Sequence, residues 1–453
     1  MRRYFGTDGI RRIANTELTP EFALKVAKAG ACVLSKHAKH TPTILIGRDT
    51  RLSGCLLESA MTAGFLSYGA NVKILGVMPT PAVAYLTRKL GADAGVVISA
   101  SHNTFEFNGI KYFSNKGTKI SDELEEEIEA ILDSEKINEL IAEHKEIGVY
   151  DFDTELEEEY INFFADIFKD RLNAKNTRKF TVGIDTANGA TYKVAEKIFT
   201  KLGINYKIIN NEPNGININE NCGSTHMENL KEFVLKNKLD LGIAYDGDGD
   251  RCLAIDEKGN TIDGDGILAI ISDKLKKEGK LKNNTLVATV MSNLGLNKYC
   301  LEQGMNIKQT KVGDRYVLEE MLKNDYNLGG EQSGHIIFLD YNPTGDGILT
   351  SLMLMEAILN RGVLASEAAS LITIYPQVLV NVKVQQEKKL DYQKDKVITD
   401  AIEKLEKEEE IGRILIRPSG TEPLVRVMIE GKNEEYINKK ANELADLIKE
   451  RLQ

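Results

Sequence analysis

The sequence predicts a multidomain α/β protein that ends in a smaller α+β domain. Its 453 residues are too many for one hydrophobic core, and about 150 residues per domain gives three or four domains. Short apolar runs alternate with helical patterns over most of the length, which indicates α/β units. The last ~80 residues break this order, because a strand-like stretch, a charged helix, a second strand-like stretch and an amphipathic helix follow one another there.

Seven apolar runs are the expected strands of the α/β part, and their alternation with helices favours largely parallel sheets. Residues 21–37 and 345–360 have apolar side chains three or four positions apart, as helices packed on a sheet do. The expected strands are 43–47, 71–77, 94–99, 180–185, 241–246, 285–290 and 334–340. Turn and charge clusters predict domains at 1–150, 151–255, 256–370 and 371–453.

Composition excludes several classes of protein. No apolar run reaches the ~18 residues of a membrane span, and the first residues lack the apolar core of a secretory signal, so we expect a cytoplasmic protein with no membrane partner. A formal charge of −10 disfavours nucleic acid as a partner. Five scattered cysteines without CxxC spacing indicate neither disulfides nor a thiolate metal site.

Much of the acidity lies between Ser121 and Glu159. Ile128, Ile131 and Leu132 recur there at helical spacing among carboxylates, which is typical of a surface helix with one solvated face. The alternative is an acidic docking site for a partner.

The clearest metal signal is Asp246-Gly-Asp248-Gly-Asp250-Arg251, directly after an apolar run. Alternating carboxylates on a glycine-loosened loop at the end of a strand can direct three hard oxygen ligands at Mg²⁺. A calcium EF-hand would place Glu257 at its twelfth position, but Arg251 stands where the EF-hand needs glycine. A plain acidic turn is the other alternative.

A second loop, Ser99-Ala-Ser101-His102-Asn103, follows another expected strand. A hydroxyl becomes a useful nucleophile when a nearby Mg²⁺ lowers the cost of its negative charge, so Ser101 is a candidate for phosphoryl transfer. Lys111 is the nearest cation that could handle protons. Serine and asparagine are also common in turns, so a turn serine stays open for this loop alone.

Two further loops are rich in glycine. Glu331, Ser333 and their neighbours offer the mixed donors and acceptors that sugar hydroxyls need, and His335 is either a proton shuttle or a structurally satisfied side chain. The loop 417–423 has a guanidinium, two hydroxyls and glycine amides, which suit a phosphate, although a tight turn is the alternative. Its candidate ligands are Arg417, Ser419, Gly420, Thr421 and the nearby Arg426.

The arginines of 47–54 favour a structural contact with a carboxylate, Asp49, over the alternative of a second phosphate site. The four loops offer a metal site, a serine that can be phosphorylated, sugar ligands and a phosphate site. A phosphatase needs only the first two of these. All four together suit an enzyme that holds one phosphate while it transfers another.

The motifs of this sequence resemble those of the α-D-phosphohexomutases, and the resemblance covers essentially the whole length of the chain. The matching stretches are RYFGTDGIR (3–11), MPTPAVAYLT (78–87), SASHN (99–103), DTANGAT (185–191), CGSTH (222–226), DGDGDR (246–251), GEQSGHI (330–336) and RPSGTEP (417–423). FGTDGIR, CGSTH and Gln332 resemble the branch that acts on glucosamine phosphates, since phosphomannomutases and phosphoglucomutases more often have methionine at the position of Gln332. Arg12, Thr104 and Phe107 depart from the family pattern.

The resemblance implies four domains around a central cleft, three of them mixed α/β. It implies a phosphate carried on Ser101, with one Mg²⁺ held by that phosphate and by Asp246, Asp248 and Asp250. Sugar hydroxyls would bind Glu331 and Ser333, and the second phosphate would bind the ligands of the 417–426 region. Residues expected to assist phosphoryl or proton transfer are Arg11, Lys111, Arg251 and His335.

The reaction that the resemblance implies converts glucosamine 6-phosphate to glucosamine 1-phosphate through an enzyme-bound glucosamine 1,6-bisphosphate, which also serves as a primer. The product would supply UDP-N-acetylglucosamine and cell-wall synthesis. The only partner expected is the small phosphosugar, and the chain acts either alone or as a homodimer. The alternatives are a phosphomannomutase or phosphoglucomutase and, from another class, a phosphosugar sensor without catalysis.

Overall fold

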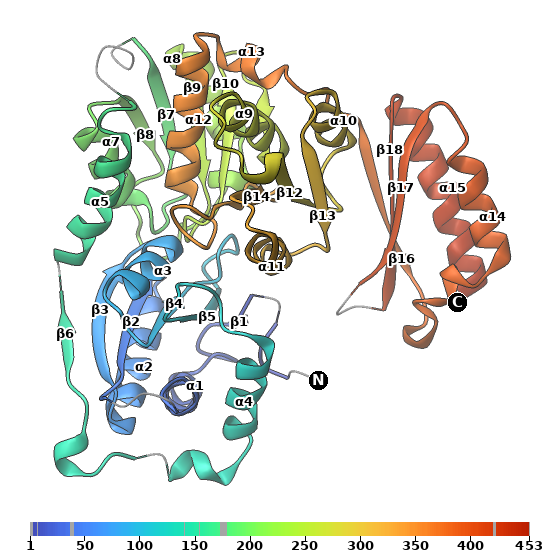
Figure 1. The fold of residues 1–453 in the computed structure, drawn as a ribbon. Coiled ribbons are helices and arrows are strands. Elements are labelled where there is room, and N and C mark those ends of the chain that lie inside the picture. Colours follow the sequence, from blue (N-terminus) through green and yellow to red (C-terminus); the bar gives the residue numbers. More distant parts are fainter. Residues whose placement is uncertain are drawn as a thin grey trace. The chain divides into compact units, whose positions relative to one another are not determined.

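The computed structural model describes residues 3–6, 8–36, 40–139, 141–153, 155–172, 179–419 and 423–452. The chain divides into two compact units. Unit 1 comprises residues 1–290 and 306–371, and unit 2 comprises residues 291–305 and 372–453. Figure 1 shows their elements in sequence colours.

The first sheet of unit 1 has six strands in the order β1-β5-β4-β2-β3-β6. Its strands are β1 (Ile10–Ile13), β2 (Thr43–Arg48), β3 (Asn71–Val77), β4 (Ala94–Ile98), β5 (Phe107–Ser114) and β6 (Tyr150–Phe152). Its helices are α1 (Pro20–Leu34), α2 (Gly54–Tyr68), α3 (Thr80–Lys89) and α4 (Asp122–Leu132).

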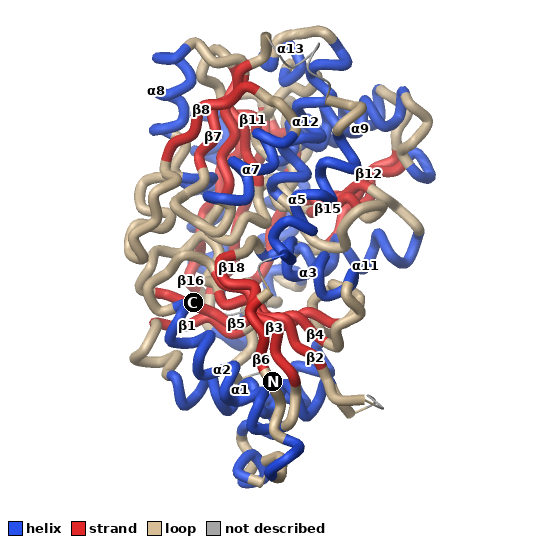
Figure 2. The backbone as a smooth tube through the Cα atoms, turned by 90° about the vertical axis from the view of Figure 1, so that its left-hand side faces the viewer, coloured by secondary structure: helices blue, strands red, loops and turns tan. Residues whose placement is uncertain are grey.

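Both faces of this sheet are covered. Ile44 and Ile46 belong to a core cluster with residues of α1 and α2, as the alternation of a strand requires. A methyl group at Gly47 would come within 2.5 Å of Val83 in α3, so glycine allows that helix to approach the other face. Figure 2 shows α1 and α2 below the strands and α3 above them.

Two more sheets complete unit 1, in the orders β11-β10-β9-β7-β8 and β13-β12-β14-β15. The second sheet and its helices comprise α5 (Glu155–Phe168), β7 (Thr181–Asp185), α7 (Tyr192–Lys201), β8 (Asn205–Ile209), α8 (Glu228–Asn237), β9 (Leu241–Tyr245), β10 (Cys252–Asp256) and β11 (Thr261–Ile262). The third comprises α9 (Gly264–Lys277), β12 (Thr285–Thr289), β13 (Asn306–Thr310), α11 (Asp314–Asn324), β14 (Leu328–Gly330), β15 (Ile336–Phe338), α12 (Gly347–Arg361) and α13 (Ala365–Ala369).

Unit 2 is an antiparallel sheet in the order β16-β18-β17, with an apolar core shared by its helices. Its elements are α10 (Leu294–Glu302), β16 (Gln377–Lys383), α14 (Lys396–Leu405), β17 (Ile411–Pro418), β18 (Leu424–Gly431) and α15 (Glu434–Leu452). The buried Glu430 carboxylate ties α10 to this sheet, because it accepts a hydrogen bond from the Leu294 amide and pairs with Arg413.

One topological rule places the loops that carry the candidate residues. In each sheet of unit 1 a central parallel strand turns back into an antiparallel neighbour, as β4 into β5, β9 into β10 and β14 into β15. The connections between these strands carry Ser101, the Asp246–Asp250 loop and the Glu331–His335 loop. In unit 2 the antiparallel pair β17 and β18 flanks the 417–423 loop in the same way.

The predicted architecture of three α/β domains and a C-terminal α+β domain is confirmed, and all seven expected strands are present. The sheets are less uniformly parallel than expected, because each one in unit 1 ends in an antiparallel edge. In the described part of the chain no helix is both long and apolar enough to cross a membrane.

The acidic segment also differs from its prediction. Helix α4 exposes much of its acidic surface, but Glu125 and Glu129 are buried. The Glu129 carboxylate accepts hydrogen bonds from the backbone amides of Arg3, Tyr4 and Phe5 at 2.7, 2.6 and 2.7 Å. This charged acceptor fixes the backbone of residues 3–5, where the FGTDGIR motif begins.

Candidate active site

Ser101 lies at the start of the β4–β5 loop, is 2% exposed and has φ of 51°. A left-handed backbone costs a non-glycine residue roughly 1 kcal/mol, so other contacts must hold it there. The Ser101 hydroxyl donates to Asp246 Oδ2 at 2.8 Å and lies 3.2 Å from His102 Nδ1. These contacts therefore hold the strained backbone of Ser101, which places its hydroxyl against the acidic loop.

Two buried side chains from other elements fix this loop through its carbonyl groups. Arg51 donates to the carbonyl oxygens of Ser101 and Asn103 at 3.0 and 2.8 Å, and also to that of Thr104. Asn219 donates to the same two carbonyl oxygens of Ser101 and Asn103 at 2.9 and 2.8 Å. The loop, which departs from the family pattern at Thr104, is thus restrained by contacts from other elements.

Arg51 itself pairs with Asp49 at 2.9 Å, with both side chains fully buried. The structural contact predicted for the 47–54 segment is therefore present. This contact does more than expected, because the same guanidinium also donates hydrogen bonds to the backbone of the serine loop.

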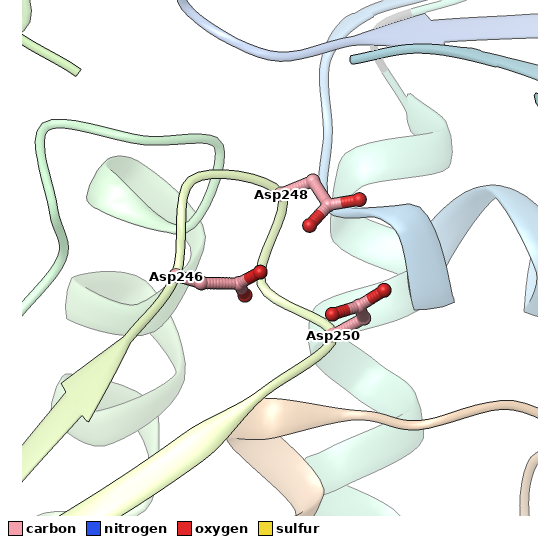
Figure 3. A group of neighbouring side chains, drawn as sticks. All are labelled: Asp246, Asp248 and Asp250. Atoms are coloured by element: carbon pink, nitrogen blue, oxygen red, sulfur yellow. The ribbon is translucent and has the colours of Figure 1, made fainter. Parts of the chain in front are cut away.

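The three aspartates of the second loop converge. One carboxylate oxygen from each of Asp246, Asp248 and Asp250 lies within 4.8 Å of the others, and all three residues are buried. Figure 3 shows the carboxylates directed into a shared space on the loop that joins β9 to β10. Gly247 and Gly249 allow the loop to turn, the second with φ of 73°.

The charges of this loop are unevenly compensated. Burial and the neighbouring Asp250 and Asp248 raise the pKa of Asp246 well above its usual range. Burial opposes ionisation of Asp248 too, but the Lys111 ammonium at 2.9 Å and the Thr80 hydroxyl at 2.6 Å outweigh it and lower its pKa. The loop thus needs more positive charge than the described side chains supply.

A divalent cation fits that requirement. Asp248 Oδ1 and Asp250 Oδ1 are buried without a hydrogen-bond partner, which is costly unless a ligand binds them. Hard carboxylate oxygens are the donors that Mg²⁺ prefers. The EF-hand alternative is disfavoured further, because Glu257 accepts a hydrogen bond from the Ser366 amide at 3.0 Å instead of turning to the loop.

The third loop lies beside the metal loop. The Cys252 amide donates to the Gly334 carbonyl at 3.0 Å, and Arg251 forms an isolated bridge with His335. Glu331 accepts from the Gly313 amide at 3.0 Å, while Ser333 is half-buried. His335 is buried, and its Nε2 accepts from the Gly345 amide at 3.3 Å.

Cationic side chains surround the same region. Lys111 is 2% exposed and lies 2.9 Å from both Asp8 and Asp248. Arg11 donates to Asn103 in the serine loop at 2.9 Å, and the Arg251 amide donates to Asp246 at 3.1 Å. The candidate residues of unit 1 thus lie on three neighbouring loops, except Arg11 on β1 and Lys111 on β5.

In unit 2, Arg417 and Arg426 are directly opposite each other on β17 and β18. Burial and the Arg426 charge lower the pKa of Arg417, so this pair of cations favours an anion. Ser419 is buried beside them, whereas Gly420 and Thr421 lie outside the described residues.

Sequence reasoning missed several residues that build the site. Asn219 and Thr80 hold the serine and metal loops, and Asp263 accepts a hydrogen bond from Gln332 at 3.1 Å. Asp8 was noted only as part of a motif, yet it binds Arg11 at 3.0 Å and Lys111. Apart from the contact of Asp8 with Arg11, these contacts join positions far apart in the chain, so no local pattern marks them.

Comparison with known proteins identifies the family of the chain. The four domain models described as phosphoglucomutase/phosphomannomutase domains I, II, III and the C-terminal domain match residues 2–139, 158–259, 263–375 and 379–447. The phosphoglucosamine mutase of Acetivibrio thermocellus is 55% identical over 100% of both chains, and that of Clostridium botulinum (strain 657) is 54% identical with the same coverage.

Solved structures share the fold at low identity. A phosphoglucomutase/phosphomannomutase family protein of Burkholderia thailandensis has a TM-score of 0.79 at 20% identity, covering 99% of this chain and 98% of the other. The Aspergillus fumigatus N-acetylphosphoglucosamine mutase, solved with GlcNAc-6P and magnesium, has a TM-score of 0.71 at 17% identity, covering 100% and 96%. The chain therefore belongs to the phosphoglucomutase/phosphomannomutase family and, within it, to the phosphoglucosamine mutases.

Proposed function

We propose that the protein interconverts glucosamine 6-phosphate and glucosamine 1-phosphate through a phosphate carried on Ser101. The observation that carries this proposal is the 2.8 Å hydrogen bond from the Ser101 hydroxyl to Asp246, within a loop whose three carboxylates suit a divalent cation. A serine with only a turn function would have no reason to lie in a strained backbone against these carboxylates.

The first half-reaction breaks the bond between phosphorus and Ser101 Oγ and forms one between phosphorus and O1 of glucosamine 6-phosphate. The proton of the O1 hydroxyl passes to a base, and Ser101 regains a proton. His335 and Lys111 are the proposed proton carriers, since both are buried beside the acidic loop. The product of this step is glucosamine 1,6-bisphosphate, held by the enzyme.

The second half-reaction reverses the transfer at the other end of the sugar. The bisphosphate reorients, Ser101 takes the 6-phosphate, and glucosamine 1-phosphate remains. Mg²⁺ bound by Asp246, Asp248 and Asp250 would stabilise the charge of the phosphoryl group during both transfers. Arg11 and Arg251 are proposed to neutralise the same charge from the protein side.

The remaining site residues are proposed to bind the sugar. Glu331 and Ser333 would bind its hydroxyls. The phosphate that is not being transferred would bind the 417–426 region, whose proposed ligands are Arg417, Ser419, Gly420, Thr421 and Arg426. The paired guanidinium groups of β17 and β18 support this assignment.

We further propose that the product feeds UDP-N-acetylglucosamine and cell-wall synthesis in the cytoplasm, and that the protein acts alone or as a homodimer. The relatives that match over their full length are phosphoglucosamine mutases, which supports the amino-sugar assignment.

The decisive experiment combines mass spectrometry with kinetics. Purified protein is digested, the Ser101 peptide is examined for phosphate, and mutase activity is compared for wild type and Ser101→Ala. We expect a phosphorylated peptide in wild type and no measurable mutase activity in the variant. Full activity of the variant would remove the proposal. Comparing kcat/KM for the 6-phosphates of glucosamine, glucose and mannose tests the sugar, and a preference for either of the last two contradicts the amino-sugar assignment.

A further inference from the structure

The Lys119 side chain lies between two carboxylates that come from distant parts of unit 1. Its ammonium donates to Asp8, in the FGTDGIR motif, and to Asp314 at 2.6 Å, the first residue of α11. The side chains of Lys119 and Asp314 are only 19% and 16% exposed. These residues have no part in the function proposed above.

The Asp8 end of this arrangement reaches one side of the proposed site. Asp8 Oδ2 lies 2.9 Å from Lys111 Nζ and 3.0 Å from Arg11 Nη2. Burial opposes the charge of Asp8, but Lys111 and Lys119 outweigh it and lower the pKa of Asp8 well below its usual range. Asp8 is therefore an anion shared among three cations.

The Asp314 end reaches the other side. Asp314 Oδ2 lies 3.6 Å from His335 Nε2, and the preceding residue, Gly313, donates its amide to Glu331. Lys119, Asp314 and His335 also line the same cavity. The position of α11 at its first turn thus determines where a proposed proton carrier and a proposed sugar ligand lie.

Ion pairs therefore connect Lys111, Asp8, Lys119 and Asp314 in turn, and the Asp314 carboxylate lies beside His335. Lys119 is the central member, and the two carboxylates that it separates would repel each other without it. Without Lys119, the ion pair of Asp8 with Lys111 would become stronger, and Asp314 would no longer be fixed beside His335.

We propose that Lys119 is a positioning residue that holds Lys111 and His335 in register for phosphoryl transfer. The inference rests on the proposed roles of those two residues in proton handling. Lys119 contacts Asp8 and Asp314, which lie beside the proposed proton carriers, so its loss should affect the chemical step more than substrate binding. A misplacement of about 1 Å in a reacting group can cost about 100-fold in rate.

The test compares Lys119→Met, which removes the charge, with Lys119→Arg, which keeps it. Lys116→Met is the matched control, because Lys116 is an exposed lysine of the same loop. With Mg²⁺ and a bisphosphate primer, we expect Lys119→Met to lower kcat about 10- to 100-fold with KM changed less than about threefold. Lys119→Arg should recover most of the loss, and the control should match wild type.

A double-mutant cycle with Asp314→Asn tests the connection itself. Since Lys119 and Asp314 act together, the double variant should lose little more kcat than Lys119→Met alone. Multiplied losses would overturn the inference, as would wild-type kcat in Lys119→Met or no recovery in Lys119→Arg.

Thermal unfolding of each variant separates this effect from a loss of fold: a kcat loss in Lys119→Met that follows only a lowered Tm contradicts positioning. Ser101→Ala separates the two proposals. If it keeps full activity, the proposed function fails. If it is inactive while Lys119→Met is fully active, only the role of Lys119 fails.

Discussion

Gly247 lies against the backbone of Ser101. A methyl group on the Gly247 Cα would come within 2.5 Å of the Ser101 carbonyl oxygen and 2.6 Å of the Asn219 amide nitrogen. The backbones of the Asp246–Asp250 loop and of the Ser101 loop are therefore in close contact. A side chain at position 247 would force the two loops apart.

Gly247→Ala should consequently lower both stability and activity. Overpacking of this kind costs about 1–3 kcal/mol, and the displaced Ser101 hydroxyl would lose its contact with Asp246. Mutase assays and chemical denaturation measure the two effects. Gly91→Ala is the control, because Gly91 has positive φ but open space around it, so it should lose about 1 kcal/mol and keep its kcat. Equal kcat in both variants would contradict the prediction.

Divalent metal should stabilise the folded protein through the aspartate loop. At a concentration 100 times the dissociation constant, Mg²⁺ should add about 2.7 kcal/mol to the free energy of unfolding, and chelation should remove it. Asp250→Asn should lose most of this response in a thermal shift assay, since it loses a buried ligand oxygen. Glu257→Gln should respond as wild type does, and a lost response there would revive the calcium-loop alternative.

Removal of the Arg51 charge should destabilise unit 1 strongly. Arg51→Met leaves the Asp49 carboxylate buried without its cation and frees the carbonyl groups of the serine loop, which should cost about 3–5 kcal/mol. Denaturation curves give this value, with Lys73→Met as the control because its ion pair is far more exposed. A loss below about 1 kcal/mol in Arg51→Met would show that the contact contributes little.

Buried Asp346 should make stability depend on pH. Burial raises the pKa of Asp346 from 3.8 to about 6, although the Leu349 amide and the Tyr160 hydroxyl act in the opposite direction. The folded protein therefore binds a proton that the unfolded chain releases, so this stability is fully present below the unfolded pKa. It is lost as pH rises through the folded pKa, by about 3 kcal/mol in total.

Asp346→Asn removes that titration. The stability of the variant relative to wild type should rise between about pH 4 and pH 7, as measured by Tm across that range. Asp151→Asn, which replaces an exposed carboxylate, should follow the wild-type curve. Parallel curves for wild type and Asp346→Asn would show that Asp346 is not protonated in the folded protein.

Local patterns were enough to predict seven strands of unit 1 and the four loops. Alternating apolar runs and glycine-rich turns reflect short-range physics, and Asp246, Asp248 and Asp250 converge because they share one turn. Contacts such as Asn219 with Ser101, or Lys119 with Asp314, depend on where separate sheets meet. Nothing in the neighbouring sequence encodes that.

The burial of Glu129 shows the same limit in a helix. The acidic pattern of α4 correctly predicted an amphipathic helix, but it could not distinguish a solvated carboxylate from one that binds three backbone amides. The antiparallel sheet edges were also missed. Strand β5 was not expected, since Asn108 and Lys111 interrupt its apolar residues although both are buried.

Each of the four loops that carry candidate residues joins two adjacent antiparallel strands. This arrangement affects how such enzymes diverge. The ends of each loop are held together by the sheet, so changing the loop's sequence or length alters its chemistry without moving the strands. Doubling the length of such a loop costs only about 0.6 kcal/mol of closure entropy. Substrate preference can therefore drift, loop by loop, on an inherited scaffold whose hydrophobic interior stays under separate selection.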